Sequence, residues 1–163
     1  MENPNAKLPY RPNVGIVVFN KDGLTLVGER LDHLGAWQFP QGGVDDGEDF
    51  AQAARRELGE ETGITDADFI FETPGFLYYD FPPSLKIARM TDRYRGQQQK
   101  WYLAYWNHPV EKANLKTHTQ EFARVLFMPM AEATNQIVPF KRAIYAELER
   151  IFLPKMDDYL RSR

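Results

Sequence analysis

One predicted helical turn carries three carboxylates, and no other feature of the chain constrains its fold as strongly. Residues 56–61 read RELGEE, so Glu57 lies three residues before Glu60 and four before Glu61. Side chains at these spacings share one helix face, about 5–6 Å apart. At an effective dielectric constant near 20, like charges at that distance repel by roughly 3 kcal/mol per pair. A hard divalent cation such as Mg²⁺ or Mn²⁺ relieves this repulsion, so the turn indicates a metal site.

The sequence around the acidic turn predicts a capped helix. Asp49 is expected to be the N-cap, with Gln52 as its reciprocal partner, so the helix begins near residue 50. The apolar face of this helix comprises Phe50, Ala54 and Leu58. We expect that face to contact the core and the three glutamates to lie largely off it. Gly63 suits the left-handed conformation that ends a helix.

A solvated acidic helix face would explain the three glutamates alone, but a longer pattern favours a metal site. The turn PQGG at residues 40–43 lacks two Cβ atoms, which lets its backbone approach a metal or a phosphate closely. From Gly42 to Ile64 the chain reads GGVDDGEDFAQAARRELGEETGI. This segment resembles the signature of the Nudix hydrolases at every constrained position.

The Nudix resemblance implies a fold, a reaction and a cofactor. The implied fold is of the α/β class, an α/β/α sandwich with a mixed sheet between helices, formed by residues 1–163 as a single domain. The implied reaction is hydrolysis of a diphosphate that is linked to another group. The implied cofactor is Mg²⁺ or Mn²⁺, as two or more ions.

The resemblance also implies roles for individual acids. Glu57 and Glu61 would be principal metal ligands, and Glu60 a ligand or the base that orients water. A backbone carbonyl near Gly42 would be a further ligand. Glu121 matches a position where related enzymes keep an additional metal-linked or basic glutamate, although the sequence alone describes only an exposed loop acid.

Other charged residues are expected to have structural roles. Glu48 and Arg56, which also belong to the signature, predict a buried ion pair that braces the loop on the helix. His33 and His118 are isolated in polar loop sequence, so neither is a candidate for the catalytic base. The acids at residues 45–49 are contiguous rather than alternating, which argues against a structural Ca²⁺ loop.

The composition favours one domain and excludes several classes of function. The 163 residues are 43% hydrophobic, enough to bury about two-thirds of the unfolded surface in one core. A net charge of −3 provides no general attraction to duplex DNA or to an anionic membrane. Cysteine is absent, which excludes disulfides and thiolate catalysis. The chain has no signal-peptide pattern and no run of about 18 apolar residues, so we expect a cytoplasmic protein. The sequence does not fix the oligomeric state, and a monomer is one possibility.

Strand and helix patterns alternate along the chain. Two β-rich runs flank the Asp-Gly turn at residues 20–23, which predicts a hairpin. The expected strands are residues 14–19, 24–29, 69–81 with a break at Pro74-Gly75, 100–106 and 123–127. Apolar residues recur at helical spacing in residues 138–153, which predicts a closing helix of about four turns.

Four segments outside the acidic cluster indicate one branch of the family. They are Arg11–Gly15, Trp37–Gly43, Tyr94–Trp101 and Val138–Arg142. Together they resemble the bacterial RNA pyrophosphohydrolases and the related asymmetric dinucleoside tetraphosphate hydrolases. The implied substrate is 5′-triphosphorylated RNA, and a dinucleoside tetraphosphate is the alternative. A non-catalytic nucleotide-binding regulator is a third interpretation, which the complete set of glutamates disfavours.

The same resemblance points to side chains that would contact a 5′-polyphosphate. They are Arg11, Arg30, Gln38, Tyr79, Lys100, Phe140 and Lys141. The arginines would contact phosphate or stack on a base, and a surface ion pair is the alternative. The two aromatic residues would offer stacking faces, and a core position is the alternative for each.

Residues 86–100 contain five cations and one acid, Asp92. Gly96 and three glutamines make the segment polar as well as basic. We therefore expect a loop that clamps a phosphate chain through charge-assisted hydrogen bonds, with an ordinary solvated loop as the alternative.

Overall fold

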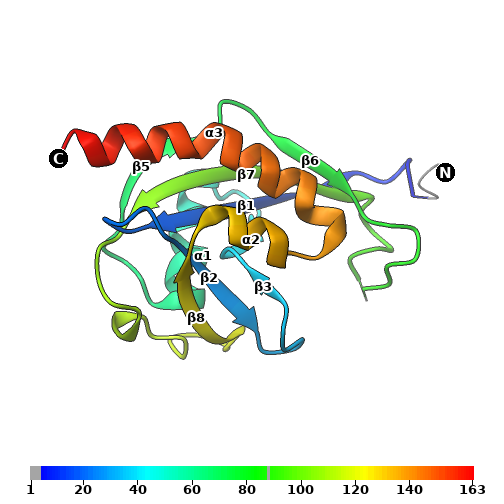
Figure 1. The fold of residues 1–163 in the computed structure, drawn as a ribbon. Coiled ribbons are helices and arrows are strands. Elements are labelled where there is room, and N and C mark those ends of the chain that lie inside the picture. The colour runs from blue at the N-terminus through cyan, green and yellow to red at the C-terminus, as the bar shows by residue number, and fades with distance from the viewer. Residues whose placement is uncertain (1–4, 88) are drawn as a thin grey trace.

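An eight-stranded mixed sheet carries helices on both of its faces (Figure 1). This computed structural model describes residues 5–87 and 89–163. The strands are β1 (Tyr10–Phe19), β2 (Thr25–Arg30), β3 (Trp37–Gln38), β4 (Gln41–Gly43), β5 (Asp68–Glu72), β6 (Leu77–Asp80), β7 (Gly96–Tyr105) and β8 (Phe122–Met128). The helices are α1 (Phe50–Thr62), α2 (Met130–Gln136) and α3 (Arg142–Arg161), with short 3-10 turns η1 (Val110–Lys112) and η2 (Pro139–Lys141). Residues 1–4, where the sequence predicts no secretory leader, and Ala88, in the predicted basic loop, lie outside the described residues.

The two longest strands, β1 and β7, form the centre of the sheet. They run parallel, from Tyr10 opposite Gly96 to Phe19 opposite Tyr105. The main strand order is β3-β2-β1-β7-β5, with β4 beside β1, β6 beside β7 and β8 beside β2. All pairings other than β1 with β7 are antiparallel. The mixed sheet predicted from the sequence is thus confirmed.

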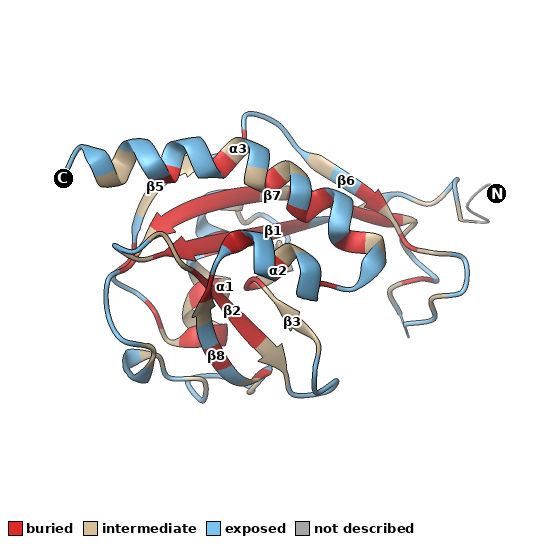
Figure 2. Ribbon diagram, in the orientation of Figure 1, coloured by how far each residue is buried: buried red, intermediate tan, exposed pale blue. Residues whose placement is uncertain are grey.

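Alternate residues of β1 supply two separate cores. Val14 and Ile16 face α1 and pack with Ala54 and Leu58, whereas the intervening side chains face α3. On that second face the core includes Val17, Phe19, Trp101, Leu103, Tyr145, Leu148 and Phe152. Figure 2 shows the central strands buried and the outer surface of α3 exposed. The predicted α/β/α layering is confirmed.

Several local predictions are also confirmed. Asp49 caps α1, accepting from the backbone N–H of Gln52, and the reciprocal half of the capping box is present. Gly63 ends the helix at φ 73°. Gly23 has φ 73° in the turn between β1 and β2, and the break at residues 74–75 separates β5 from β6.

Two predictions on element boundaries are wrong, and one helix was missed. Residues 96–100 belong to β7 rather than to a basic loop, because Gln97 and Gln99 alternate with more exposed residues and are buried on a central strand. The predicted helix from residue 138 begins as η2, and α3 follows and continues past Pro154 to Arg161. The short helix α2 was not predicted at all.

Candidate active site

A cleft of about 1310 Å³ opens between the start of β1, the β2–β3 loop and the turn before α3. Acids and cations both line it. Of the residues proposed from the sequence, the lining includes Arg11, Arg30, Gln38, Gly42, Glu57, Tyr79, Glu121, Phe140 and Lys141. Segments that are distant in the sequence therefore meet around one space.

Glu57 projects from α1 against the turn at β4. A Cβ atom at Gly42 would collide with the Glu57 carboxyl group, so a glycine is required there. The Glu57 side chain is 12% exposed, and Nη1 of Arg56 donates to its Oε1 at 2.9 Å. Burial raises the pKa of Glu57 to about 7, although Arg56 opposes the shift. The site thus holds a carboxylate that burial disfavours.

Glu61 is buried, at 2% exposure, so the expectation that all three glutamates lie off the core face is wrong for this residue. The cause is tertiary packing, because α1 contacts β4 and the Gln41 N–H donates to Oε2 of Glu61 at 3.0 Å. Oε1 of Glu61 has no hydrogen-bond partner among the described residues. Burial, and then the charge of Glu121, raises the pKa of Glu61 well above its usual range.

Glu121 reaches the helix from the loop that precedes β8. Its carboxyl group lies beside that of Glu61 and raises the pKa of Glu61 through its charge. The Glu121 carbonyl accepts from the Leu31 N–H at 2.8 Å, and the Thr117 hydroxyl donates to the Gly59 carbonyl on α1 at 3.0 Å. The loop is therefore attached to α1 and to the residue that follows β2. We call Glu57, Glu61 and Glu121 the acidic cluster.

Glu60 lies beside the acidic cluster rather than in the cleft lining. Its Oε2 accepts from Nη1 of Arg56 at 3.1 Å, and its side chain is 30% exposed. Nε2 of His118 is 3.8 Å from Oε1 of Glu60. The sequence offered no partner for His118, and the fold supplies one.

Arg56 braces the turn onto the helix. Its Nε and Nη2 donate to the two oxygens of Glu48 at 2.8 and 2.9 Å, and Nη2 also reaches the Gly43 carbonyl at 2.9 Å. The predicted ion pair with Glu48 is confirmed, with partly buried side chains. The Arg56 hydrogen bonds hold the pKa of Glu48 below its usual value.

The acidic cluster fits a hard divalent cation in donor chemistry. As the side chains stand, no three acidic or histidine groups of residues 5–87 and 89–163 are spaced to hold a metal ion. Arg56 donates to Glu57 of the cluster and to the neighbouring Glu60. However, Oε1 of Glu61 is buried without a donor, next to a second carboxyl group. A cation is the partner that removes both costs.

Lys141 is the buried cation of the cleft. Its side chain lies near the rings of Tyr79 and Phe140, with Nζ 5.8 and 5.9 Å from their centres. No acid of the described residues forms an ion pair with it, and burial lowers the pKa of Lys141 to about 8. Tyr79 is 9% exposed and its hydroxyl has no partner within the described chain. We call Lys141, Phe140 and Tyr79 the lysine pocket.

The two arginines of the cleft differ in their partners. Arg11 runs against Gly43, where a Cβ atom would collide with its guanidinium. Arg30 donates through Nε and Nη2 to both oxygens of Asp32, at 2.9 and 2.7 Å. The ion pair considered as an alternative from the sequence therefore exists for Arg30.

Lys100 is placed outside the cleft lining. It lies on β7, where Nζ is 3.3 Å from Glu72 and 5.7 Å from the centre of the Phe76 ring. Its neighbour Gln99 faces the opposite side of the sheet, because successive side chains of a strand alternate. The fold does not bring Lys100 together with the other proposed substrate contacts.

Sequence reasoning named Gln38 but missed three other amide side chains of the cleft. Asn13, Gln41 and Gln97 contribute to its lining. Asn13 and Gln97 are 1% and 4% exposed. Gln97, Gln99 and Trp101 alternate along the chain, which is the spacing of a strand face. This signal was missed because two of the three residues are polar.

The chain belongs to the Nudix family. The model of the NUDIX domain matches residues 9–148. An RNA pyrophosphohydrolase from Cereibacter sphaeroides is 43% identical over 152 residues, which cover 91% of this chain and 94% of that protein. With the acidic cluster and its glycine turn, these matches identify a hydrolase that acts on phosphoanhydride bonds.

Solved structures confirm the fold independently of sequence. The E. coli dihydroneopterin triphosphate pyrophosphohydrolase has a TM-score of 0.65 at 19% identity, covering 85% of this chain and 96% of that chain. A C. elegans Ap4A hydrolase has a TM-score of 0.61 at 20% identity, covering 87% and 98%. Among the residues described, no helix has both the length and the apolar character needed to cross a bilayer.

Proposed function

We propose that this Nudix hydrolase converts the 5′-triphosphate of RNA to a 5′-monophosphate with release of pyrophosphate. The observation that carries the proposal is a single cleft lined by Glu57 and Glu121 together with Lys141 and Phe140. A nucleoside polyphosphate with bound cations needs acids to hold the cations, and a basic and an aromatic side chain to contact its phosphates and its base. The similarity to the RNA pyrophosphohydrolase of Cereibacter sphaeroides supports RNA as the substrate.

Nudix hydrolases generally use divalent metal ions, and we propose Mg²⁺ or Mn²⁺ here, as two or more ions. The residues that would hold them are Glu57, Glu60, Glu61, Glu121 and the carbonyl of Gly42. Such ions supply charge neutralisation for phosphate oxygens and lower the pKa of water. The unpartnered Oε1 of Glu61 supports this placement.

The remaining residues would orient the substrate and move the proton. Glu60, at 30% exposure, would orient or deprotonate the attacking water, and Glu121 is the alternative base. Arg11, Arg30 and Lys141 would donate to phosphate oxygens. Phe140 and Tyr79 would flank the first base, and Gln38 would contact the substrate nearby. In this scheme no side chain acts as a nucleophile.

We propose further that residues 1–163 form a single domain. Its location would be the cytoplasm, and it would bind neither duplex DNA nor a membrane. The oligomeric state, a monomer included, is left open by the proposal. Measurement of the molecular mass in solution would determine the oligomeric state.

Product analysis would test the proposed substrate. The enzyme is incubated with triphosphorylated RNA and, separately, with diadenosine tetraphosphate, with and without Mg²⁺ or Mn²⁺. We expect metal-dependent monophosphorylated RNA and a higher rate on RNA than on the dinucleotide. A large preference for the dinucleotide would establish the alternative substrate. Metal-dependent nucleotide binding without any product would instead indicate a regulator.

A further inference from the structure

Three strands bring amide side chains together on the cleft side of the sheet. Asn13 of β1 lies opposite Gln99 of β7. Two residues along β1, Gly15 lies opposite Gln41 of β4 on one side and Trp101 of β7 on the other. The side chains of Asn13 and Gln41 line the cleft, whereas Gln99 is almost fully buried beneath them.

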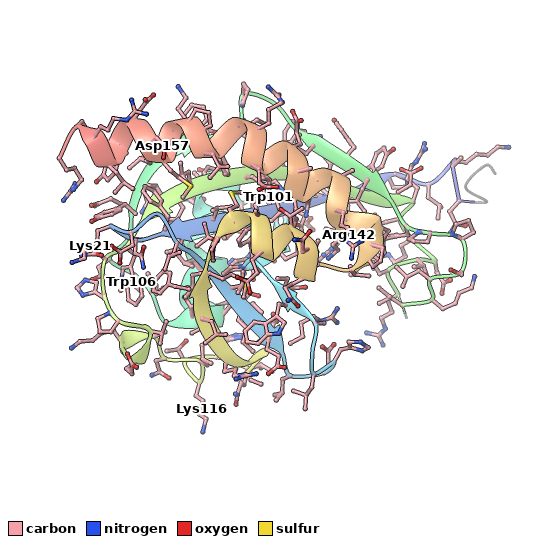
Figure 3. All side chains as sticks on the ribbon, in the orientation of Figure 1. Lys21, Trp101, Trp106, Lys116, Arg142 and Asp157 are labelled. Atoms are coloured by element: carbon pink, nitrogen blue, oxygen red, sulfur yellow. The ribbon has the colours of Figure 1, made fainter. Side chains whose placement is uncertain are left out.

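The Trp101 ring is fixed by its surroundings. It is fully buried, and Figure 3 shows it between the sheet and α3. A Cβ atom at Gly15 would collide with the ring, so the absent side chain makes its space. The rings of Phe39 and Tyr145 lie edge-on to it, with centres 6.1 and 6.0 Å away. The indole N–H therefore has one direction in which to donate.

That direction sets the orientation of the Gln99 amide. Nε1 of Trp101 donates to Oε1 of Gln99 at 3.0 Å, and an indole nitrogen is only ever a donor. The oxygen of Gln99 must face the indole, so its NH₂ group faces the other way. Nε2 of Gln99 donates to Oδ1 of Asn13 at 2.9 Å and to Oε1 of Gln41 at 3.4 Å.

The same logic continues to the cleft surface. Because Asn13 and Gln41 turn their oxygens toward Gln99, their NH₂ groups remain for other partners. No described residue accepts a hydrogen bond from Nδ2 of Asn13 or from Nε2 of Gln41. Asn13 is 1% exposed and lines the cleft, so its NH₂ group is a free donor at the cleft surface beside the turn that contains Gly42. An anionic ligand in the cleft would accept from such donors, and hydrogen bonds to a charged acceptor are the stronger ones.

We propose that Nδ2 of Asn13 and Nε2 of Gln41 form a donor pair for phosphate oxygens, held in the donating orientation by Trp101 through Gln99. An amide can present either a donor or an acceptor, and a carbonyl oxygen turned to the cleft would repel a polyphosphate. Trp101 and Gln99 are positioning residues, since neither contacts the ligand. The inference rests on the proposed function only in taking a polyphosphate as the ligand.

Two tryptophan variants test the relay. Trp101→Phe keeps most of the ring and removes the N–H, which frees the Gln99 amide to rotate. Trp106→Phe is the matched control, because Nε1 of Trp106 also donates a single bond, to Asp66 at 2.9 Å. Figure 3 shows the two tryptophans well apart. The probe is inorganic tripolyphosphate as a competitive inhibitor of the metal-loaded enzyme.

We expect the inhibition constant of tripolyphosphate to rise about fivefold in Trp101→Phe and to stay unchanged in Trp106→Phe. The KM for a nucleotide substrate should rise with it, while kcat changes less than about twofold, because the donors act on the bound ground state. Side-chain amide resonances of Asn13 and Gln41 should shift with tripolyphosphate in Trp106→Phe and respond more weakly in Trp101→Phe. Equal inhibition constants in the two variants would overturn the relay.

A second variant covers the case in which Trp101→Phe does not fold. Gln41→Met is neutral, similar in length and located where the side chain is only partly buried. It removes one donor and should weaken tripolyphosphate about threefold. Unchanged inhibition in Gln41→Met would overturn the donor pair. Failure of the enzyme to cleave triphosphorylated RNA would overturn the proposed function alone, since the amide resonances of Asn13 and Gln41 report tripolyphosphate binding without turnover.

Discussion

The acidic cluster and the lysine pocket place buried groups of opposite charge around one cleft. Glu61 is a buried carboxylate whose Oε1 lacks a donor, and Lys141 is a buried cation without an ion pair in the described chain. Burial favours the neutral form of each group, because it raises the pKa of Glu61 and lowers the pKa of Lys141. Neither group stabilises the empty protein, because a buried unpaired charge is costly. The comparison supports the proposal that each region binds an ion of opposite sign, a metal cation in the acidic cluster and a phosphate in the lysine pocket.

Glu61→Gln should have the largest effect, because it removes a charge that the cation requires. We expect kcat to fall by more than the roughly 10–100-fold that follows loss of residues around metal ligands. The metal-free protein should unfold at the same or a higher temperature, since a buried charge is gone. Turnover at saturating Mg²⁺ and thermal unfolding would be measured together. Asp157→Asn on the exposed side of α3 is the control, and near-normal turnover in Glu61→Gln would contradict the account.

Lys141→Met tests the other region. The substitution keeps an unbranched apolar stem but removes the charge that would bind phosphate. We expect KM for triphosphorylated RNA to rise about tenfold or more, with a smaller change in kcat. Steady-state kinetics would separate the two parameters. If kcat collapsed while KM stayed constant, Lys141 would belong to the chemical step and the comparison would fail.

The pH dependence of stability should reveal the acidic cluster without any substrate. The pKa of Glu57 is about 7 in the folded protein, above its ordinary value of 4.5, so the folded state binds more protons between these values. Stability of the metal-free protein should therefore fall as pH rises from about 4.5 to 7, by up to about 3 kcal/mol. Added Mg²⁺ should restore more stability at pH 7.5 than at pH 5. Denaturant unfolding would measure this, and a flat profile that Glu57→Gln leaves unchanged would count against the cluster.

Lys100→Met should have the smallest effect. Lys100 lies outside the cleft lining and pairs with Glu72, whose side chain is 57% exposed. Exposed ion pairs contribute little to stability. We therefore expect the equilibrium constant of unfolding and the KM each to change by less than about twofold. The same assays used for Lys141→Met would apply. A KM increase equal to that of Lys141→Met would show that the substrate extends across the sheet to β7.

The sequence predicted best what depends on neighbours along the chain. The caps at Asp49 and Gly63 and the brace between Glu48 and Arg56 follow from spacing within one segment, and all were found. The longer strands were also located, because their buried faces are apolar and alternate, whereas the short strands β3 and β4 were not predicted. Family resemblance added the set of residues around the cleft, most of which the fold does bring together.

The sequence predicted poorly what depends on packing between distant segments. The burial of Glu61 results from β4 lying against α1, and that of Lys141 from η2 meeting Tyr79, so neither is visible in local spacing. Gln97 and Gln99 suggested a loop because they are polar, yet they occupy the buried face of β7 where it forms the cleft. Hydrophobic periodicity does not predict such positions, because the buried residues next to the cleft are polar rather than apolar.

The central claim is that the acidic cluster gathers cations to break a phosphoanhydride bond. Its most direct test is a crystal soaked with Mn²⁺ and a nonhydrolysable RNA 5′-triphosphate analogue, with anomalous diffraction recorded at the manganese edge. The account predicts manganese peaks within bonding distance of Glu57, Glu61 and Glu121, in contact with the phosphates. An occupied analogue with no manganese at these three carboxylates would contradict it.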